Sequence, residues 1–230
     1  MNRFETITFV YNEEFLLPFY LKHYDFVDRF NIIYDTDSFD KTLEILQANP
    51  KVNIIPYTFP DMMNDGLKVQ MINRFYKGIL DAWVLNVDVD EFVFIDKTPR
   101  EKINTVSLYN VYRHVKDKDL SLDKTIREQR FHGVLDPRYN KPILVRSGLK
   151  ILWKPGNHNF VKHEKPEPTY IGAHWANADP CFCVQRRCRD RRDRQSKHNL
   201  EYHLTTQHHH ITEEDVLKHC KEHDHDPICF

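Results

Sequence analysis

The stretch LNVDVDEFVFID, residues 85–96, joins an apolar run to a cluster of acids. The run Ala82–Val87 is typical of a buried strand, and Asp88, Asp90 and Glu91 follow it within four positions. An unpaired buried charge destabilises a fold by several kcal/mol unless a cation or hydrogen bonds compensate it. The acids at the end of this strand therefore require a partner.

Three similar strand patterns precede this one, and helical patterns separate them. The expected strands are Phe4–Tyr11, Phe30–Tyr34, Val52–Phe59 and Ala82–Val87. The expected helices begin near Pro18, Ser38 and Leu67 and end near Arg29, Ala48 and Leu80. This β-α-β-α-β-α-β order predicts an α/β fold with a mostly parallel central sheet flanked by helices, in a single domain.

The second half of the chain is less regular. Thr98–Glu101 forms a capping-box pattern that predicts a short helix. Further strands are expected at 106–115, 141–146 and 149–153. The segment 154–180 is rich in Pro, Gly, His and Asn, which predicts irregular structure, and the basic stretch 184–203 predicts a solvated helix.

Polar residues follow three of the expected strands at the point where each ends. Asn12 and Glu13 follow the first strand, 35–38 (DTDS) follow the second, and 88–91 follow the fourth. Ligands of parallel α/β sheets bind at the carboxyl ends of the strands. The pattern therefore predicts a ligand site on this edge of the sheet.

Asp88 and Asp90 flank Val89, so the alternation of a strand points both carboxylates the same way. Such a pair suits Mg²⁺ or Mn²⁺, and a metal held there would bridge the phosphates of a nucleotide-sugar. A two-carboxylate phosphatase or nuclease site is a second interpretation. It is disfavoured by Phe92, because an aspartyl phosphatase has Thr or Val at that position and its motif ends the first strand. The third interpretation is an ordinary acidic turn.

Three segments, FVYNEEFLLPFYLKHY, FNIIYDTDSFDKT and QMINRFYKGILDAWVLNVDVDEFVFID, occur in this order. Together they resemble the nucleotide-sugar half of GT-A-fold glycosyltransferases, specifically the family-2-like group and its relatives in family 92, with D-x-D-E-F. The resemblance covers residues 4–96 well and 141–180 loosely. It implies a GT-A-like domain over 1–203, divided into a nucleotide-sugar-binding half (1–96) and an acceptor half (97–203), followed by a His-rich tail (204–230).

The resemblance implies roles for individual residues. The nucleotide-sugar would contact Asn12, Glu13, Asp35, Ser38, Asp88 and Trp153. Asp90 would ligate Mn²⁺ or Mg²⁺, with Asp88 beside it, and Glu91 would support the loop. His174, in IGAHWANAD, resembles the histidine that supplies a further metal ligand, and its rivals are His158, His203 and His208. Asp37 departs from the Asn or Ser common near that position.

A one-step inverting transfer needs a group that accepts the proton of the acceptor hydroxyl. The candidates are Asp136, Glu164, Asp179 and His158, and the sequence does not choose among them. We predict that the catalytic residues are Asp88, His158 and Asp179. Trp153 and His158 both lie in WKPGNHNF, where the family places sugar contacts, although a core tryptophan is the simpler interpretation.

The C-terminal region allows other interpretations. Cys181, Cys183 and Cys188 raise a structural zinc site with the later histidines, but their spacing matches no standard knuckle. The basic run 186–194 is by default a solvated helix face. Binding of a phosphorylated or lipid-linked acceptor is the alternative, and nucleic acid is disfavoured because aromatic residues are absent from the run.

Composition excludes several classes of protein. The 230 residues include 33 basic and 34 acidic side chains, a net charge of −1 that favours neither nucleic acid nor membrane as partner. No run of about 18 residues is free of charge, so no membrane span is expected. Met1–Glu5 lacks a signal-peptide core, and five cysteines, an odd number, favour a reducing, cytoplasmic setting. The six glycines form neither a dinucleotide-binding nor a Walker loop.

The sequence thus predicts a metal-dependent glycosyltransferase of the Leloir type. It would move a sugar from a UDP- or GDP-hexose donor to a glycan hydroxyl acceptor. The alternative is a non-catalytic nucleotide- or zinc-binding interaction module. Both a small stand-alone enzyme and a part of a larger multidomain enzyme stay open.

Overall fold

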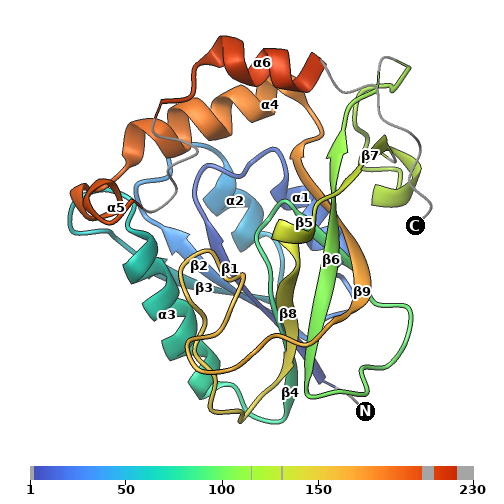
Figure 1. Cartoon of the computed structure of the whole chain (residues 1–230), viewed down its shortest axis with the longest axis vertical. Helices are drawn as coiled ribbons and strands as arrows, with labels where there is room; N and C mark the ends of the chain where they lie inside the picture. The colour runs from blue at the N-terminus through green and yellow to red at the C-terminus, as the bar shows by residue number, and fades with distance from the viewer. Residues whose placement is uncertain (1–2, 115, 131, 204–209, 222–230) are drawn as a thin grey trace.

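The computed structural model describes residues 3–114, 116–130, 132–203 and 210–221. These residues form one nine-stranded sheet with helices on both faces (Figure 1). The strand order is β3-β2-β1-β4-β8-β6-β9-β5, and β7 pairs with β6. The expected fold class, an α/β domain with a central sheet flanked by helices, is confirmed. Within the described residues, no helix is long and apolar enough to cross a membrane.

The first half follows the predicted alternation of strands and helices. Its strands are β1 (Arg3–Val10), β2 (Arg29–Asp35), β3 (Val52–Tyr57) and β4 (Ala82–Asn86), and neighbours among them pair in parallel. Its helices are α1 (Leu17–His23), α2 (Thr42–Gln47) and α3 (Asp65–Gly78). All seven predicted elements are confirmed, with shifted ends.

The alternation of side chains along β1 divides the core into two layers. Val10 packs in one buried cluster with residues of α1 and α2, such as Tyr20 and Leu46. Ile7 and Phe9 belong to another cluster, with residues of α3 such as Ile72. Since successive strand residues point to opposite faces, α1 and α2 cover one face of the sheet and α3 covers the other.

The second half adds strands of both directions, of which β6 and β9 run with the first four and the others run against them. They are β5 (Glu91–Phe94), β6 (Ile103–Tyr112), β7 (His132–Leu135), β8 (Lys141–Arg146) and β9 (Pro168–Asn177), with short 3₁₀ turns η1 (Ile126–Glu128) and η2 (Pro137–Tyr139). The strand pairs β4–β8, β5–β9, β6–β7 and β6–β8 are antiparallel, and β6–β9 is parallel. The sheet is therefore mixed rather than mostly parallel, and the expected halves 1–96 and 97–203 share it.

Three local expectations are wrong. No helix follows Thr98, because the residues after the capping-box pattern alternate and enter β6 rather than presenting a helical apolar face. Residues 149–153 form no strand, and Trp153 makes an isolated bridge to Phe160 while its side chain fills the core. The segment 154–180 is not irregular throughout, since it contains β9.

The C-terminal basic stretch folds as a chain of short helices along the upper rim in Figure 1. They are α4 (Pro180–Val184), the π-helix η3 (Gln185–Arg191), the 3₁₀ turn η4 (Arg192–Arg194) and α5 (Lys197–Glu201). Inside the predicted tail, α6 (Glu213–Lys221) packs on this region through Val216, which is buried with Cys183 and Cys188.

Gly172 explains why β9 was missed and yields a test of the sheet. A Cβ at this position would lie 2.7 Å from the Phe92 carbonyl oxygen on β5 and 2.8 Å from Leu108 Cδ2 on β6. We expect Gly172→Ala to lower the free energy of unfolding by about 1–3 kcal/mol, since one overpacked methyl in a closed core has an effect of that size.

Gly78→Ala is the matched control. No atom lies within 4 Å of its added Cβ, and alanine in a helix stabilises by about 0.5–1 kcal/mol relative to glycine. Urea denaturation of both variants measures the difference. Equal stability of the two variants would contradict the close approach of β5, β6 and β9.

Candidate functional site

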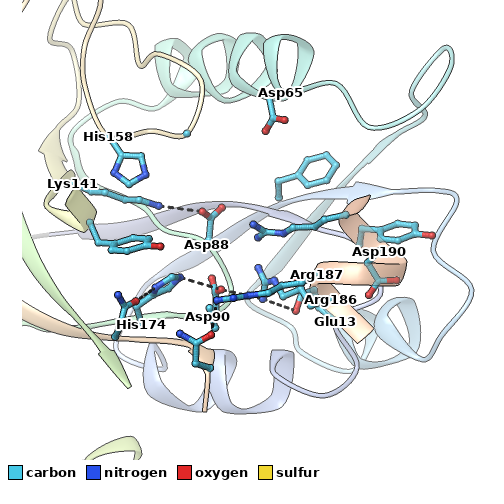
Figure 2. A pocket seen from close by; sticks show the side chains of 18 of the residues that line it. Glu13, Asp65, Asp88, Asp90, Lys141, His158, His174, Arg186, Arg187 and Asp190 are labelled. Carbon is cyan, nitrogen blue, oxygen red and sulfur yellow. Dashed lines mark hydrogen bonds and ion pairs between the residues drawn. The ribbon is translucent and has the colours of Figure 1, made fainter. Parts of the chain in front are cut away.

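A cavity of about 360 Å³ lies at the carboxyl ends of β1 and β4 (Figure 2). Its walls carry carboxylates and cations from both halves of the chain. The titratable residues that line it include Glu13, Asp65, Lys68, Asp88, Asp90, Asp136, Lys141, His158, His174, Arg186, Arg187, Asp190 and Arg191. The cavity is thus placed where the strand-end pattern predicted a ligand site.

Asp88 is held between two lysines. Its Oδ1 lies 3.0 Å from Lys68 Nζ on α3, and its Oδ2 lies 3.3 Å from Lys141 Nζ on β8. Its backbone N–H donates to Glu91 Oε2 at 3.0 Å. Although burial opposes ionisation, Lys68 and Lys141 hold the pKa of Asp88 well below its usual range. Asp88 is therefore a carboxylate at neutral pH.

Lys141 joins Asp88 to Glu91. It forms a close ion pair with Glu91 Oε1 in addition to its contact with Asp88. Both Lys141 and Glu91 are buried, with 5% and 1% exposure. Burial lowers the pKa of Lys141, but Glu91 and Asp88 outweigh it and raise the pKa above its ordinary value. Glu91 thus contacts Lys141 through one carboxylate oxygen and the backbone N–H of Asp88 through the other.

Asp90 is 1% exposed and faces two basic side chains. Its Oδ2 lies 3.3 Å from His174 Nε2 on β9 and 3.3 Å from Arg186 on η3. Burial opposes ionisation, yet Arg186 and His174 lower the pKa of Asp90 far below its usual range. On the other edge of the ring, His174 Nδ1 lies 2.7 Å from Asn110 Oδ1 on β6.

Glu13 completes the acidic side of the cavity. It follows Asn12, whose φ of 49° turns the chain sharply at the end of β1, a conformation that asparagine tolerates. Glu13 is 6% exposed and its Oε1 lies 3.3 Å from Arg186. Burial raises the pKa of Glu13 from 4.5 to about 7, although Arg186 opposes the shift.

The predicted nucleotide contacts that lie beside the cavity are bonded to the C-terminal stretch. Asn12 Nδ2 donates to Asp190 Oδ1 at 3.3 Å, and its backbone N–H donates to Ser38 Oγ at 3.3 Å. Asp35, which is fully buried, pairs with Arg194 at 2.9 Å. The Arg194 guanidinium also stacks on Tyr11, 3.4 Å from the ring centroid.

The remaining predicted residues are divided between the cavity and its surroundings. His158 lines the cavity, and burial lowers its pKa to about 4, with Lys141 adding to the shift. Asp179 lies outside, where it caps α4 by accepting from the Phe182 N–H at 3.1 Å. Trp153 is 1% exposed in the core and its Nε1 donates to the Pro142 carbonyl. As placed, neither side chain can touch a ligand in the cavity.

Sequence reasoning missed the cations that pair with the acids. Lys68 and Lys141 lie in an ordinary helix and strand, and no spacing links them to Asp88. Arg186 belongs to the run expected to be solvated, yet it is 7% exposed, so that expectation is wrong at this residue. The only signal in the sequence was indirect. Buried acids require cationic partners, but the positions of those partners in the chain could not be read from the acids.

The sequence suggested a divalent-cation site at the acids after β4 and, as an alternative, a zinc site at the cysteines. Over the described ranges, no group of three or more His, Cys, Asp or Glu side chains is arranged to hold a metal ion. Cys181 is exposed, and Cys183 and Cys188 are buried as free thiols. Among the proposed rivals of His174, His203 is exposed and His208 lies outside the described residues.

Comparisons with known proteins find only distant similarity. No protein-family model and no curated protein matches the sequence. The structure of S. aureus TarS 1–349 in complex with UDP covers 95% of this chain and 70% of that one, at 15% identity and a TM-score of 0.41. The match to a crystal structure of 4-diphosphocytidyl-2C-methyl-D-erythritol synthase covers 64% of this chain and 76% of that one, at 9% identity and a TM-score of 0.38.

The lengths of the matched proteins also differ. The chain spans 36% of the S. aureus TarS chain in one structure, at 17% identity and a TM-score of 0.38, and 59% of its 1–349 form in another.

Glu13 gives a pH test of the site. Between pH 4.5 and about 7 the folded chain retains a proton on Glu13 that the unfolded chain has lost. Stability should therefore fall as pH rises through this window, by up to about 1.4 kcal/mol per pH unit. Glu13→Gln removes this dependence, so its stability relative to the wild type should rise from pH 4.5 to 7.

Urea denaturation of both proteins at several pH values measures this difference. Glu14→Gln is the control, because Glu14 is exposed. Parallel stability profiles for wild type and Glu13→Gln would show that the carboxyl titrates normally.

Proposed function

We propose that this chain is a glycosyltransferase of the GT-A type that moves a sugar from a nucleotide-diphosphate donor to a glycan hydroxyl. The donor is of the UDP- or GDP-hexose type, and Mn²⁺ or Mg²⁺ is the cofactor. The observation that carries the proposal is the arrangement of Asp90 and His174 in a cavity at the carboxyl ends of parallel strands.

The donor atoms of this pair fit a divalent cation. Asn110 Oδ1 lies 2.7 Å from His174 Nδ1, and a proton on Nδ1 would make this contact a hydrogen bond and leave a lone pair on Nε2 for a metal ion. His174 Nε2 lies 3.3 Å from Asp90 Oδ2, a buried oxygen that also lies 3.3 Å from Arg186 Nη1. Two acceptors at this distance repel each other unless a proton or a cation lies between them.

Carboxylate oxygen and imidazole nitrogen are both suitable ligands for Mn²⁺, and the carboxylate also for Mg²⁺. Asp90 and His174 would hold the ion. Asp88 is the less suitable ligand, since Lys68 and Lys141 contact both of its oxygens. A bound ion would neutralise charge on the departing nucleoside diphosphate.

The chain's own cations support the same chemistry. Lys68, Lys141 and Arg186 lie around the acids and can stabilise phosphate charge. Asp88 would accept hydrogen bonds from ribose or sugar hydroxyls. For proton acceptance from the acceptor, His158 and Asp136 line the cavity, and the lowered pKa of His158 keeps its ring neutral at pH 7.

The alternative is a nucleotide-binding module without turnover. It is favoured by the internal pairing of the acids, because Asp88, Asp90, Glu91 and Glu13 each contact a basic side chain of the chain itself. This module would bind a nucleotide-sugar and release it unchanged. Incubation with UDP- and GDP-sugars and glycan acceptors separates the two functions by product formation.

Asp90→Asn tests the metal proposal. The variant keeps the shape of the side chain but removes the charge that a metal ion requires. We expect Mn²⁺ to tighten UDP or GDP binding to the wild type, and this gain to fall by about 10–100-fold in Asp90→Asn, as in disrupted metal sites. Isothermal titration calorimetry with and without Mn²⁺ measures the gain.

Asp61→Asn, at an exposed loop residue, is the matched control, and His174→Gln should behave like Asp90→Asn. If nucleotide binds with the same affinity with and without Mn²⁺ in all four proteins, metal dependence is wrong. If no sugar is transferred by the wild type although nucleotide-sugar binds, the module without turnover is correct.

A further inference from the structure

The π-helix η3 turns several arginines toward the cavity. In an α-helix, residues five apart lie about 140° from each other around the axis, and the i→i+5 hydrogen bonds of a π-helix bring them closer to the same side. Arg186 and Arg191 are related in this way, and both line the cavity together with Arg187. Arg189, on the same element, is 61% exposed and pairs with Glu213 at 3.6 Å.

Most of the other cations in the cavity are neutralised by acids of the chain. Lys68 pairs with Asp88, and Lys141 pairs with Asp88 and Glu91. Arg186 pairs with Glu13 and Asp90. A phosphate group approaching these side chains also meets the carboxylates beside them, which reduces the attraction.

Arg187 has a different environment. It is half-buried, and its Nη2 donates to Asn177 Oδ1 at the end of β9. Asn177 is uncharged and 3% exposed. Throughout the described residues, no carboxylate lies within ion-pair distance of Arg187. Arg187 follows Arg186 along η3, and both line the cavity (Figure 2).

We infer that Arg187 binds a phosphate group of the donor's diphosphate and thereby sets a preference for nucleoside diphosphates over monophosphates. This inference rests on the proposed function. A guanidinium has five N–H donors, so the bond to Asn177 leaves donors for a phosphate in the fork geometry that arginine provides. The anchor on a buried strand residue holds the side chain in place before the ligand arrives, which reduces the entropy lost on binding.

The experiment compares Arg187→Gln with Arg189→Gln, which removes an arginine from the exposed side of the same element. Calorimetry measures the affinities of UDP, UMP, GDP, GMP and inorganic pyrophosphate in Mn²⁺ buffer. Arg187→Gln should lower the affinity for the diphosphates and for pyrophosphate by about 10–100-fold, which corresponds to the loss of one charge-assisted hydrogen bond. The affinity of Arg187→Gln for the monophosphates should change by less than about threefold. Arg189→Gln should bind all five ligands with the affinity of the wild type.

Asn177→Ala provides a second variant that keeps the charge and removes the anchor. We expect it to weaken diphosphates less than Arg187→Gln does, with circular dichroism and thermal unfolding checking that both variants fold. Equal weakening of mono- and diphosphates in Arg187→Gln, or no weakening, overturns the inference.

The outcomes also separate the inference from the proposed function. If the wild type binds pyrophosphate but no nucleotide, and Arg187→Gln loses pyrophosphate, the anion site stands and the proposed function fails. If the wild type binds diphosphates and Arg187→Gln binds them equally well, the inference fails and the proposed function stands. If the wild type binds none of the five ligands, both fail.

Discussion

The ion pairs of Lys141 with Asp88 and Glu91 are the interaction on which the site depends. Removing one partner of a buried ion pair destabilises a protein by about 3–5 kcal/mol, because the other charge is left uncompensated. Lys141 is buried between two carboxylates, and Asp88 forms a further ion pair with a second lysine, Lys68. The charges are therefore mutually dependent, and Lys68 and Lys141 are what keep the pKa of buried Asp88 below its usual range.

The mixed sheet brings these charges together. β8 runs antiparallel to β4 and carries Lys141 at its first residue, which places that lysine at the carboxyl end of β4 beside the acids. β9 pairs with β5 with Glu91 opposite His174. The loop after β4 thus supplies Asp88 and Asp90, the antiparallel strand β8 supplies the lysine, and β9, which runs in the same direction as β4, supplies the histidine.

The sequence predicted the local part of this arrangement. β1 to β4 were recognisable because apolar runs and helical patterns are properties of neighbouring residues. The acids at 88–91 were recognisable because they interrupt such a run. The contacts from Lys141 to Glu91, 50 residues apart, and from Arg186 to Glu13, 173 residues apart, leave no local pattern. β9 was hidden for a related reason, since Gly172 weakens the strand pattern but is required by the neighbouring strands.

The C-terminal stretch 185–199 changes how the predicted nucleotide contacts must be understood. Asn12, Glu13 and Asp35 were expected to meet a ligand, but each is bonded to this stretch, through Asp190, Arg186 and Arg194 respectively. The planar guanidinium of Arg194 stacks on the Tyr11 ring, and its polar edge forms an ion pair with Asp35.

A nucleotide that used Tyr11 and Asp35 would have to replace Arg194. The Asp35 side chain in the Arg194–Asp35 ion pair is 0% exposed. Breaking this ion pair would therefore oppose nucleotide binding unless the released guanidinium formed a new ion pair or hydrogen bond. A ligand rich in phosphate supplies acceptors for both.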